Sequence, residues 1–439
     1  MKKRTNNFNN FLNKHLSLII VSFILIQPIL DLLTSLEINV LHIGLSLGSI
    51  IRFIFLLFCS YYILFINKEN KIKYILLLVF LYLVSYAVVI HKYKGQEILS
   101  YELRNGINAF YLPIILLAFY SMFKNKAINI KPNHLLIVYL ICITFILFPN
   151  ITNTGFMSYY HSKVGSTGWF YSANAIGNML AFLLPFLLYY LIKSNIHLLF
   201  KILISISTLY VFVSMGTKVP VLGLMLSLLV HFIYYLIVWI KEKKYRYITI
   251  SIGIVVVGVI ASILVLPKTS FYKNIQIHKE FLGFDHYYDV FTDYKLIDHF
   301  IFSQRLTFLK NTNNNYKEVS MAEKVLGMGY IEKYGTDLET DKTIEIDYFE
   351  VFYRHGILGC IIFYLAIIPF MFKFLTTKYE SSLLNLEFKL SITLILLLSL
   401  FSGHVLVAPS ISIFVALLIT MFINKDNYYN FKINKKNKA

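Results

Sequence analysis

The residues of this sequence that could do chemistry gather in one polar stretch, residues 268–347, and in the segment that follows it. Glu345 and Asp347 end the stretch, and Glu350 and Arg354 come next. Once a helix begins there, spacings of three and four place Asp347, Glu350 and Arg354 on one face. Glu350 and Arg354 are then most simply an ion pair. Glu345, or Asp347 as second choice, could act as a general base toward a hydroxyl group, because partial removal from water raises a carboxylate's pKa.

Two positively charged residues could bind an anion at the same membrane face. Arg305 lies where apolar and polar residues alternate over 300–310, a pattern that predicts a short amphipathic helix on the membrane surface. Its guanidinium suits the oxygens of a phosphate, although a surface arginine often only touches lipid headgroups. Lys218 lies in the turn 214–220, where helix N-terminal amides could assist an anion. The alternative for Lys218 is an ordinary interfacial lysine.

Three more polar residues lie within or at the ends of apolar runs. Arg52 and Arg104 fall in such runs, where an ionisable side chain costs enough to mark a functional candidate. Either arginine could instead form a structural ion pair or reach the headgroups. His404 follows Ser402 and Gly403, where a histidine is more often a hydrogen-bonded cap than a catalyst. We keep Arg52, His404 and Arg354 as possible substrate contacts, and Arg104 as a further anion ligand.

Composition determines the class of protein. Of 439 residues, 57% are hydrophobic and only 15% are charged, and the mean hydropathy is +0.65. Soluble domains have roughly one quarter charged residues. The chain is therefore expected to be an integral membrane protein. Its three cysteines fall in apolar runs, and the sequence has neither a metal-ligand spacing nor a phosphate-binding glycine loop, so we expect no metal and no cofactor.

The apolar runs predict an all-α bundle of about twelve transmembrane helices. A membrane-spanning helix needs about 20 apolar residues. Such runs occur at 16–36, 44–66, 72–91, 101–123, 134–150, 170–192, 197–215, 219–240, 246–267, 348–375, 386–403 and 405–423. The chain thus divides into helices 1–9 (1–267), one large loop (268–347), and helices 10–12 with a tail (348–439).

The positive charges of the loops predict the orientation. Lys and Arg concentrate at both ends of the chain and in alternate loops, whereas the short loops opposite hold only Lys92, Lys94, Lys163 and Lys218. By the positive-inside rule, this alternation places both termini in the cytoplasm and the loop 268–347 outside, in a multi-pass protein of the cytoplasmic membrane without a cleavable signal peptide. The net charge of +18 therefore reflects membrane orientation and not a nucleic-acid partner.

The order of the polar motifs resembles the O-antigen ligase and polysaccharide polymerase superfamily of bacterial envelopes. Its distinctive parts cover roughly residues 165–360. They are a Gly-, Ser- and Asn-containing segment at 165–178, the turn Gly216-Thr217-Lys218, the sequence Ser303-Gln304-Arg305-Leu306, the turn Leu326-Gly327-Met328-Gly329, and Glu345 followed eleven residues later by Gly356-Ile357-Leu358-Gly359. Two positions depart from the family pattern: Lys218 replaces a common arginine, and Glu345 replaces the histidine that ligases commonly carry.

The resemblance implies a glycosyl transfer on the outer membrane face. Lys218 and Arg305 would neutralise the pyrophosphate of an undecaprenyl-pyrophosphate-linked glycan, and Glu345 or Asp347 would deprotonate the acceptor hydroxyl, with inversion of configuration. The carboxylate at position 345 favours a polymerase over a ligase that hands finished glycan to a wall, lipid or protein acceptor. A flippase or exporter of lipid-linked oligosaccharide is the alternative from another class. Membrane lipids and other polysaccharide-assembly membrane proteins are the further partners expected.

Overall fold

Apolar helices dominate the computed structural model, which describes residues 2–42, 46–159, 163–331, 344–377 and 382–424, with the side chains from residue 14 onward. The helices are α1 (Lys2–Leu25), α2 (Gln27–Asn39), α3 (Leu47–Tyr61), α4 (Asn70–Lys94), α5 (Leu99–Ala109), α6 (Tyr111–Lys124), α7 (Pro132–Thr152), α8 (Ala173–Lys193), α9 (Leu198–Ser214), α10 (Lys218–Lys241), α11 (Tyr245–Val265), α12 (Ser270–Leu282), α13 (Tyr294–Phe300), α14 (Arg305–Glu318), α15 (Met321–Leu326), α16 (Asp347–Thr376), α17 (Leu383–Phe401) and α18 (Pro409–Ile423). Short helical turns follow α3 (Tyr62–Ile66) and α11 (Leu266–Lys268) and precede α13 (Tyr287–Phe291), and β1 (Phe156–Met157) pairs antiparallel with β2 (Ser166–Gly168).

Where it is described, each of the twelve predicted spans overlaps one or two helices. Among the described residues, nine helices are long and apolar enough to cross a membrane, and α1 with α2 makes a tenth that is bent by 46°. The bend lies just before Pro28, at the start of α2, where a proline lacks the N–H that a continuous helix needs. The other two, α9 and α18, have 17 and 15 residues and are shorter than a full span. The prediction of an all-α integral membrane protein is confirmed.

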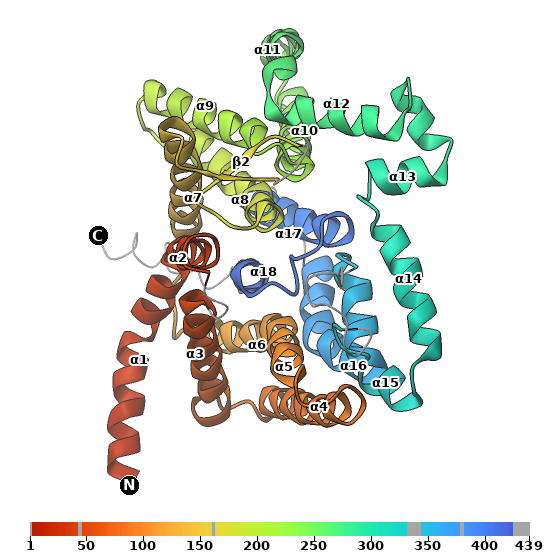
Figure 1. The fold of residues 1–439 in the computed structure, drawn as a ribbon. Helices are drawn as coiled ribbons and strands as arrows, with labels where there is room; N and C mark the ends of the chain where they lie inside the picture. Colours follow the sequence, from red (N-terminus) through yellow and green to blue (C-terminus); the bar gives the residue numbers. More distant parts are fainter. Residues whose placement is uncertain (1, 43–45, 160–162, 332–343, 378–381, 425–439) are drawn as a thin grey trace, which may run out of the picture.

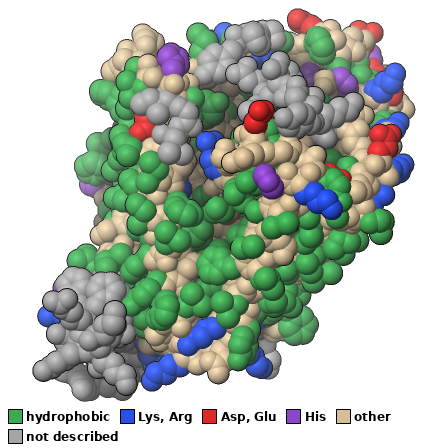
Figure 2. Space-filling model, turned by 60° about the horizontal axis from the view of Figure 1, so that its bottom comes forward, with side chains coloured by type: hydrophobic (Ala, Val, Ile, Leu, Met, Phe, Trp, Pro, Cys, Tyr) green, Lys and Arg blue, Asp and Glu red, His purple; other side chains and the backbone are tan. Residues whose placement is uncertain are grey.

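The last helix, α18, forms the centre of the bundle. It packs against α6, α8, α16 and α17, and every residue from Ile411 to Ile423 is buried (Figure 1). By contrast, α11 lies at the periphery and has no buried residue. Hydrophobic side chains cover the broad middle of the surface in Figure 2, where charged side chains are sparse. Such a surface matches a hydrocarbon environment.

The polar stretch 268–347 is largely helical where it is described. Helices α12, α13 and α14 run along one edge of the bundle in Figure 1 and lead into α15. We call the part of the bundle surface that carries α12, α13 and α14 the loop side. The predicted amphipathic helix over 300–310 is corrected in one respect: α13 ends at Phe300, and α14 begins only at Arg305.

The break between α13 and α14 has a local cause in Asp298. Its buried carboxylate accepts hydrogen bonds from the N–H groups of Leu306 (2.9 Å) and Thr307 (3.0 Å) and from the Thr307 hydroxyl (2.6 Å). These bonds satisfy the otherwise unpaired amides of a helix start. Ser303 and Gln304 take left-handed conformations, with φ of 52° and 69°, to make the turn. Arg305 is thereby placed in the first turn of α14 and faces the bundle.

Candidate functional site

Arg305 is buried against Glu345, which precedes α16. The Nη2 atom of Arg305 lies 2.6 Å from Oε2 of Glu345 and donates to the carbonyl oxygen of Ser402 at 3.2 Å. Its Nη1 donates to the carbonyl of Phe302, also at 3.2 Å. The Nε atom is buried and has no hydrogen-bond partner among the described residues. Arg305 is only 6% exposed, so it is not the surface arginine that the amphipathic pattern suggested.

His404 contacts the other oxygen of the same carboxylate. Its Nε2 lies 3.7 Å from Oε1 of Glu345, and the side chains of both residues are about one third exposed. The link between α17 and α18 brings it there through Gly403, whose φ is +63°. A Cβ atom on Gly403 would lie 2.4 Å from the carbonyl oxygen of Glu345, so only glycine fits. We call Arg305, Glu345 and His404 the Glu345 centre.

The backbone of this centre is strained at two residues. Glu345 and His404 both have positive φ, 54° and 57°, a conformation that residues with a Cβ rarely adopt. The link that holds His404 is fixed from α8, where the Asn178 amide donates to the carbonyl of Gly403 at 3.0 Å. Such conformations persist only where surrounding contacts enforce them, and they cluster at functional sites.

Electrostatics give the two partners opposite pKa shifts. Burial raises the pKa of Glu345, but its interactions with His404 and then with Arg305 outweigh burial and hold the pKa below its ordinary value. Burial lowers the pKa of His404, but Glu345 and then the carboxylates of Asp347 and Glu350 raise it above its ordinary value. The raised pKa predicted for position 345 is therefore wrong. Near neutral pH this carboxyl is ionised.

Asp347 is hydrogen-bonded to the backbone of the α17–α18 link. Its carboxylate accepts hydrogen bonds from the N–H groups of His404 (2.8 Å), Val405 (2.9 Å) and Leu406 (2.7 Å). The residue is 1% exposed. Three charge-assisted bonds of this kind fix the link, and with it the position of the His404 side chain.

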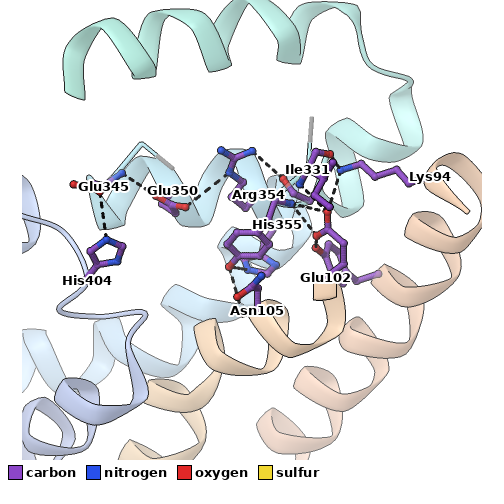
Figure 3. A network of polar contacts seen from close by, with 12 residues as sticks. Lys94, Glu102, Asn105, Ile331, Glu345, Glu350, Arg354, His355 and His404 are labelled. Carbon is purple, nitrogen blue, oxygen red and sulfur yellow. Dashed lines mark hydrogen bonds and ion pairs between the residues drawn. The ribbon is translucent and has the colours of Figure 1, made fainter. Parts of the chain in front are cut away.

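Glu350 and Arg354 continue from the centre along α16 (Figure 3). Glu350 accepts from the N–H of Glu345 at 3.0 Å and pairs with Nε of Arg354 at 3.8 Å. The predicted ion pair between Glu350 and Arg354 is thus present. Arg354 is fully buried and also donates to the carbonyl of Gly329 at 3.1 Å. The contacts described for Arg354 are therefore with the protein itself.

The far end of this network is a cluster that sequence reasoning missed. Glu102 of α5 is fully buried and accepts from the Tyr86 hydroxyl (2.8 Å), from Nζ of Lys94 (3.2 Å), and from the N–H groups of Tyr330 and Ile331 (Figure 3). We call Glu102 and these four partners the anchor. A carboxylate inside an apolar run was the available signal, since such residues are rare in membrane spans.

Glycines bring the polar turn 327–329 against α16. A Cβ on Gly327 would lie 2.4 Å from the carbonyl oxygen of Arg354, and one on Gly329 would lie 2.7 Å from the Glu102 carboxylate. Gly356 interrupts the helical backbone of α16 with φ of +63°. Its Cβ would meet the Gly327 nitrogen at 2.6 Å. The glycines of the motif thus permit a close backbone approach that no other residue allows.

Two lysines lie near Arg305 on the loop side. Nζ of Lys218, at the start of α10, donates to the carbonyl of Phe300 and lies 4.2 Å from the centre of that ring. Lys163 and Arg305 both interact with Lys218 through their charges. We call Lys163, Lys218 and Arg305 the cationic group. Lys163 was not among the predicted anion ligands, because nothing in the sequence places it beside Lys218.

The pKa of His278, on α12, is affected by the positive charges of this region. Burial, and then the charges of Lys218, Lys163 and His299, lower the pKa of His278 to about 4. His278 is therefore neutral at pH 7, and a bound anion would favour its protonated form. The arrangement can bind a phosphate or pyrophosphate group.

One buried asparagine holds the two lysine-bearing loops together. The Asn274 amide donates to the carbonyl oxygens of Val164 (2.5 Å) and Gly216 (2.9 Å). Its carbonyl oxygen accepts from the N–H of Val164 at 2.7 Å. Because Lys163 and Lys218 flank these contacts in the chain, Asn274 fixes the distance between them.

The remaining predicted residues lie elsewhere. Arg52 pairs with Asp31 at 2.6 Å on the neighbouring helices α2 and α3. Arg104 is exposed on α5. This helix also carries Glu102, which lies at the end of the network opposite to Glu345. The structure thus joins Arg305, Glu345, Asp347 and His404 directly, and it places Lys218 beside them.

Comparison with known proteins identifies the family. Residues 10–284 and 292–426 match the family model described as O-antigen ligase like membrane protein, which covers most of the chain. No curated protein matches the chain. The match confirms the resemblance that the polar motifs indicated. The chain therefore belongs to the family of O-antigen ligase like membrane proteins, and it is a membrane protein of glycosyltransferase type.

Proposed function

We propose that the chain is a bacterial cell-surface polysaccharide polymerase. It transfers an undecaprenyl-pyrophosphate-linked glycan to a sugar hydroxyl of an acceptor at the outer face of the cytoplasmic membrane, with inversion and without a metal. The observation that carries this proposal is the ion pair between the buried Arg305 and the partly exposed Glu345, 2.6 Å apart, beside Lys218 and Lys163. It provides an anion ligand and a carboxylate base at one point of the loop side.

The cationic group binds the pyrophosphate of the donor. Arg305 has a buried Nε atom without a partner among the described residues, and a phosphate oxygen would supply one. Lys218 and Lys163 add charge where the leaving group becomes more negative during the reaction. Stabilising charge that develops in the transition state is an effective contribution to catalysis. The lipid tail would remain between the helices and the bilayer.

Glu345 accepts the proton of the acceptor hydroxyl. When the pyrophosphate draws Arg305 toward itself, Glu345 loses its nearest positive partner, and its pKa rises toward the range of a useful base. The acceptor oxygen then forms a bond to the anomeric carbon. The bond from that carbon to the pyrophosphate oxygen breaks, its electron pair leaves with the lipid pyrophosphate, and the hydroxyl proton passes to Glu345. Because the hydrogen bonds of Asp347 are taken by backbone amides, we assign it a positioning role through His404.

A ligase is the second candidate, and the description of the matching family favours it. The donor chemistry would be the same, and finished glycan would pass to a wall, lipid or protein acceptor. Glu345 in place of the histidine common in ligases supports the polymerase.

The test compares lipid-linked glycans in a deletion strain that carries the wild-type gene, Arg305→Ala or Lys310→Ala. Lys310 is exposed on the same helix as Arg305 and is the matched control. Mass spectrometry should find single repeat units on undecaprenyl pyrophosphate in the deletion strain and with Arg305→Ala, and polymer with Lys310→Ala. Long polymer retained on the lipid would indicate a ligase instead. Units retained on the cytoplasmic leaflet would indicate a flippase and refute the transferase.

A further inference from the structure

A small cavity lies beside α18, bounded by α2, α3 and α8. It has a volume of about 170 Å³, and its polar lining comes from Asp31, Thr34, Arg52, Tyr171, Ser172 and Ser410. At roughly 30 Å³ per water molecule, it holds about five or six waters. That volume is comparable to one pyranose ring. Tyr171 is 52% exposed at its edge, so the cavity has access to the surface.

The guanidinium of Arg52 is fixed at the wall of this cavity. Its Nη2 lies 2.6 Å from Oδ1 of Asp31, and its Nε donates to Oε1 of Gln27 at 3.0 Å. Nη1 has no hydrogen-bond partner among the described residues. The two helices approach closely here because of Gly48: a Cβ there would lie 2.3 Å from the hydroxyl of Thr34. The pair is thus pre-organised and keeps a hydrogen-bond donor.

The chemistry of the cavity differs from that of the cationic group. Arg52 and Asp31 cancel each other's charge, so the cavity has no excess positive charge to attract a phosphate. It offers instead a guanidinium N–H, a carboxylate, serine and threonine hydroxyls, and the aromatic ring of Tyr171. A neutral ligand rich in hydroxyl groups, with an apolar ring face, matches this set of groups. A sugar ring is such a ligand.

Two elements connect the cavity to the Glu345 centre. Ser172, the N-cap residue of α8, lines the cavity, and Asn178 of α8 donates to the carbonyl of Gly403, next to His404. The chain then runs from His404 into α18, where Ser410 lines the cavity. Arg305 of the cationic group donates to the carbonyl of Ser402, which belongs to the same α17–α18 link. The cavity and the cationic group therefore both contact elements joined to this link.

We propose that this cavity binds one sugar ring of the acceptor glycan and so presents the acceptor hydroxyl toward Glu345. The inference rests on the proposed function, in which an acceptor sugar is needed. It assigns the neutral cavity to the acceptor and the cationic group to the pyrophosphate of the donor. It also gives Arg52 a role in binding through its fixed N–H groups.

The test measures binding without turnover. The probe is the repeat-unit oligosaccharide of the host's own polysaccharide, released from its lipid, titrated by equilibrium dialysis into the protein in nanodiscs. We expect Tyr171→Ala and Ser410→Phe each to weaken binding by about tenfold, because one removes the aromatic wall and the other fills the cavity. Tyr288→Ala, which alters a 66% exposed tyrosine of the polar stretch, is the matched control and should bind as wild type does.

The outcomes separate this inference from the proposed function. Wild-type protein that does not bind the oligosaccharide, or both variants binding it as wild type does, would overturn the sugar site. Inorganic pyrophosphate that displaces the oligosaccharide competitively would show an anion site and overturn it as well. Release of undecaprenyl pyrophosphate from the lipid-linked donor is assayed in parallel. Binding without such release in the wild type would refute the transferase and keep the sugar site.

Discussion

The two ends of the polar network in Figure 3 contain similar residues, but their hydrogen-bonding groups are paired to different extents. In the anchor, Glu102 is fully buried and both of its oxygens accept hydrogen bonds from the protein. In the Glu345 centre, the carboxylate is about one third exposed, His404 lies 3.7 Å away, and Nε of Arg305 lacks a partner among the described residues. Both ends contain a carboxylate with a cation.

The difference separates a polar cluster that supports the fold from one that can react. Each donor in the anchor already has its acceptor, so a ligand would have to break bonds to enter. In the Glu345 centre, some hydrogen-bonding groups have no partner and the backbone is strained. A substrate could supply the missing hydrogen-bond partners, and release of the backbone strain could contribute to its binding or reaction. Incomplete hydrogen bonding, more than burial or charge, distinguishes the end that we propose to be catalytic.

The largest expected effect comes from Glu345→Gln. Loss of the base should lower the rate of polymer formation by about 10²–10⁴-fold, while the protein folds and still binds pyrophosphate through the cationic group. The measurement is the release of undecaprenyl pyrophosphate from lipid-linked donor by protein in nanodiscs. Full activity of Glu345→Gln with an inactive Asp347→Asn would show that the base is Asp347.

The same change at the other end should damage the fold. Glu102→Gln leaves the buried Lys94 without its only carboxylate partner among the described residues and turns an amide donor toward other donors, at a cost of about 3–5 kcal/mol. We expect a lower unfolding temperature in detergent and less protein in the membrane. Glu97→Gln, at a nearby exposed position, should match wild type. A stable but inactive Glu102→Gln protein would remove the distinction between the two ends.

The helices were predictable because crossing a membrane imposes a length and an apolar composition on each one. The segments from 16–36 to 405–423 follow from that constraint alone. The bend before Pro28 and the short α9 and α18 were not predicted, since packing against neighbours sets them. The break between α13 and α14 was also missed, because a side-chain cap provided by Asp298, eight residues before Leu306, leaves no periodic signal.

The candidate site was only partly predictable. The residue types at Arg305, Glu345 and His404 marked them as candidates, but their pairing depends on a fold that joins positions 40 and more residues apart. The pKa of Glu345 was predicted in the wrong direction because its partners were unknown. Lys163 was overlooked for the same reason, because only the fold places it beside Lys218. Glu102 did carry a sequence signal, as a carboxylate inside an apolar run, but its partners are set by the fold.

Gly403→Ala should have an intermediate effect by disturbing the Glu345 centre through the backbone. The residue has φ of +63°, and its Cβ would lie 2.4 Å from the Glu345 carbonyl oxygen. We expect a loss of about 1–3 kcal/mol in stability and a lower rate, because Glu345 and His404 are pushed apart. Gly253→Ala on α11 meets no atom within 4 Å and should be neutral or slightly stabilising. Equal unfolding temperatures of the two variants would contradict the strained-link interpretation.

The smallest expected effect concerns pH. The interaction between His404 and Glu345 contributes to the stability of the folded protein, and this contribution should depend on pH. The pKa of His404 is raised in the folded protein, so its contribution is fully present below about pH 6.5 and is lost as pH rises through the raised pKa. The pKa of Glu345 is lowered, so its contribution is present above about pH 4.3 and is lost as pH falls through the lowered pKa. The pair should stabilise most between these limits.

The measurement is the difference in unfolding temperature between wild type and His404→Ala from pH 4 to pH 9, a range set by ordinary carboxyl and imidazole values of about 4.3 and 6.5. The difference should shrink toward alkaline pH, and its pH dependence should be weaker in a Glu345→Gln background, where only Asp347 and Glu350 remain to raise the pKa of His404. It should also be small, because His404 is partly exposed and 3.7 Å away. A difference that grows with pH would mean that His404 is neutral in the folded protein. Glu345 would then act beside a second base, and the contrast between a saturated anchor and an ionic reactive centre would need to be redrawn.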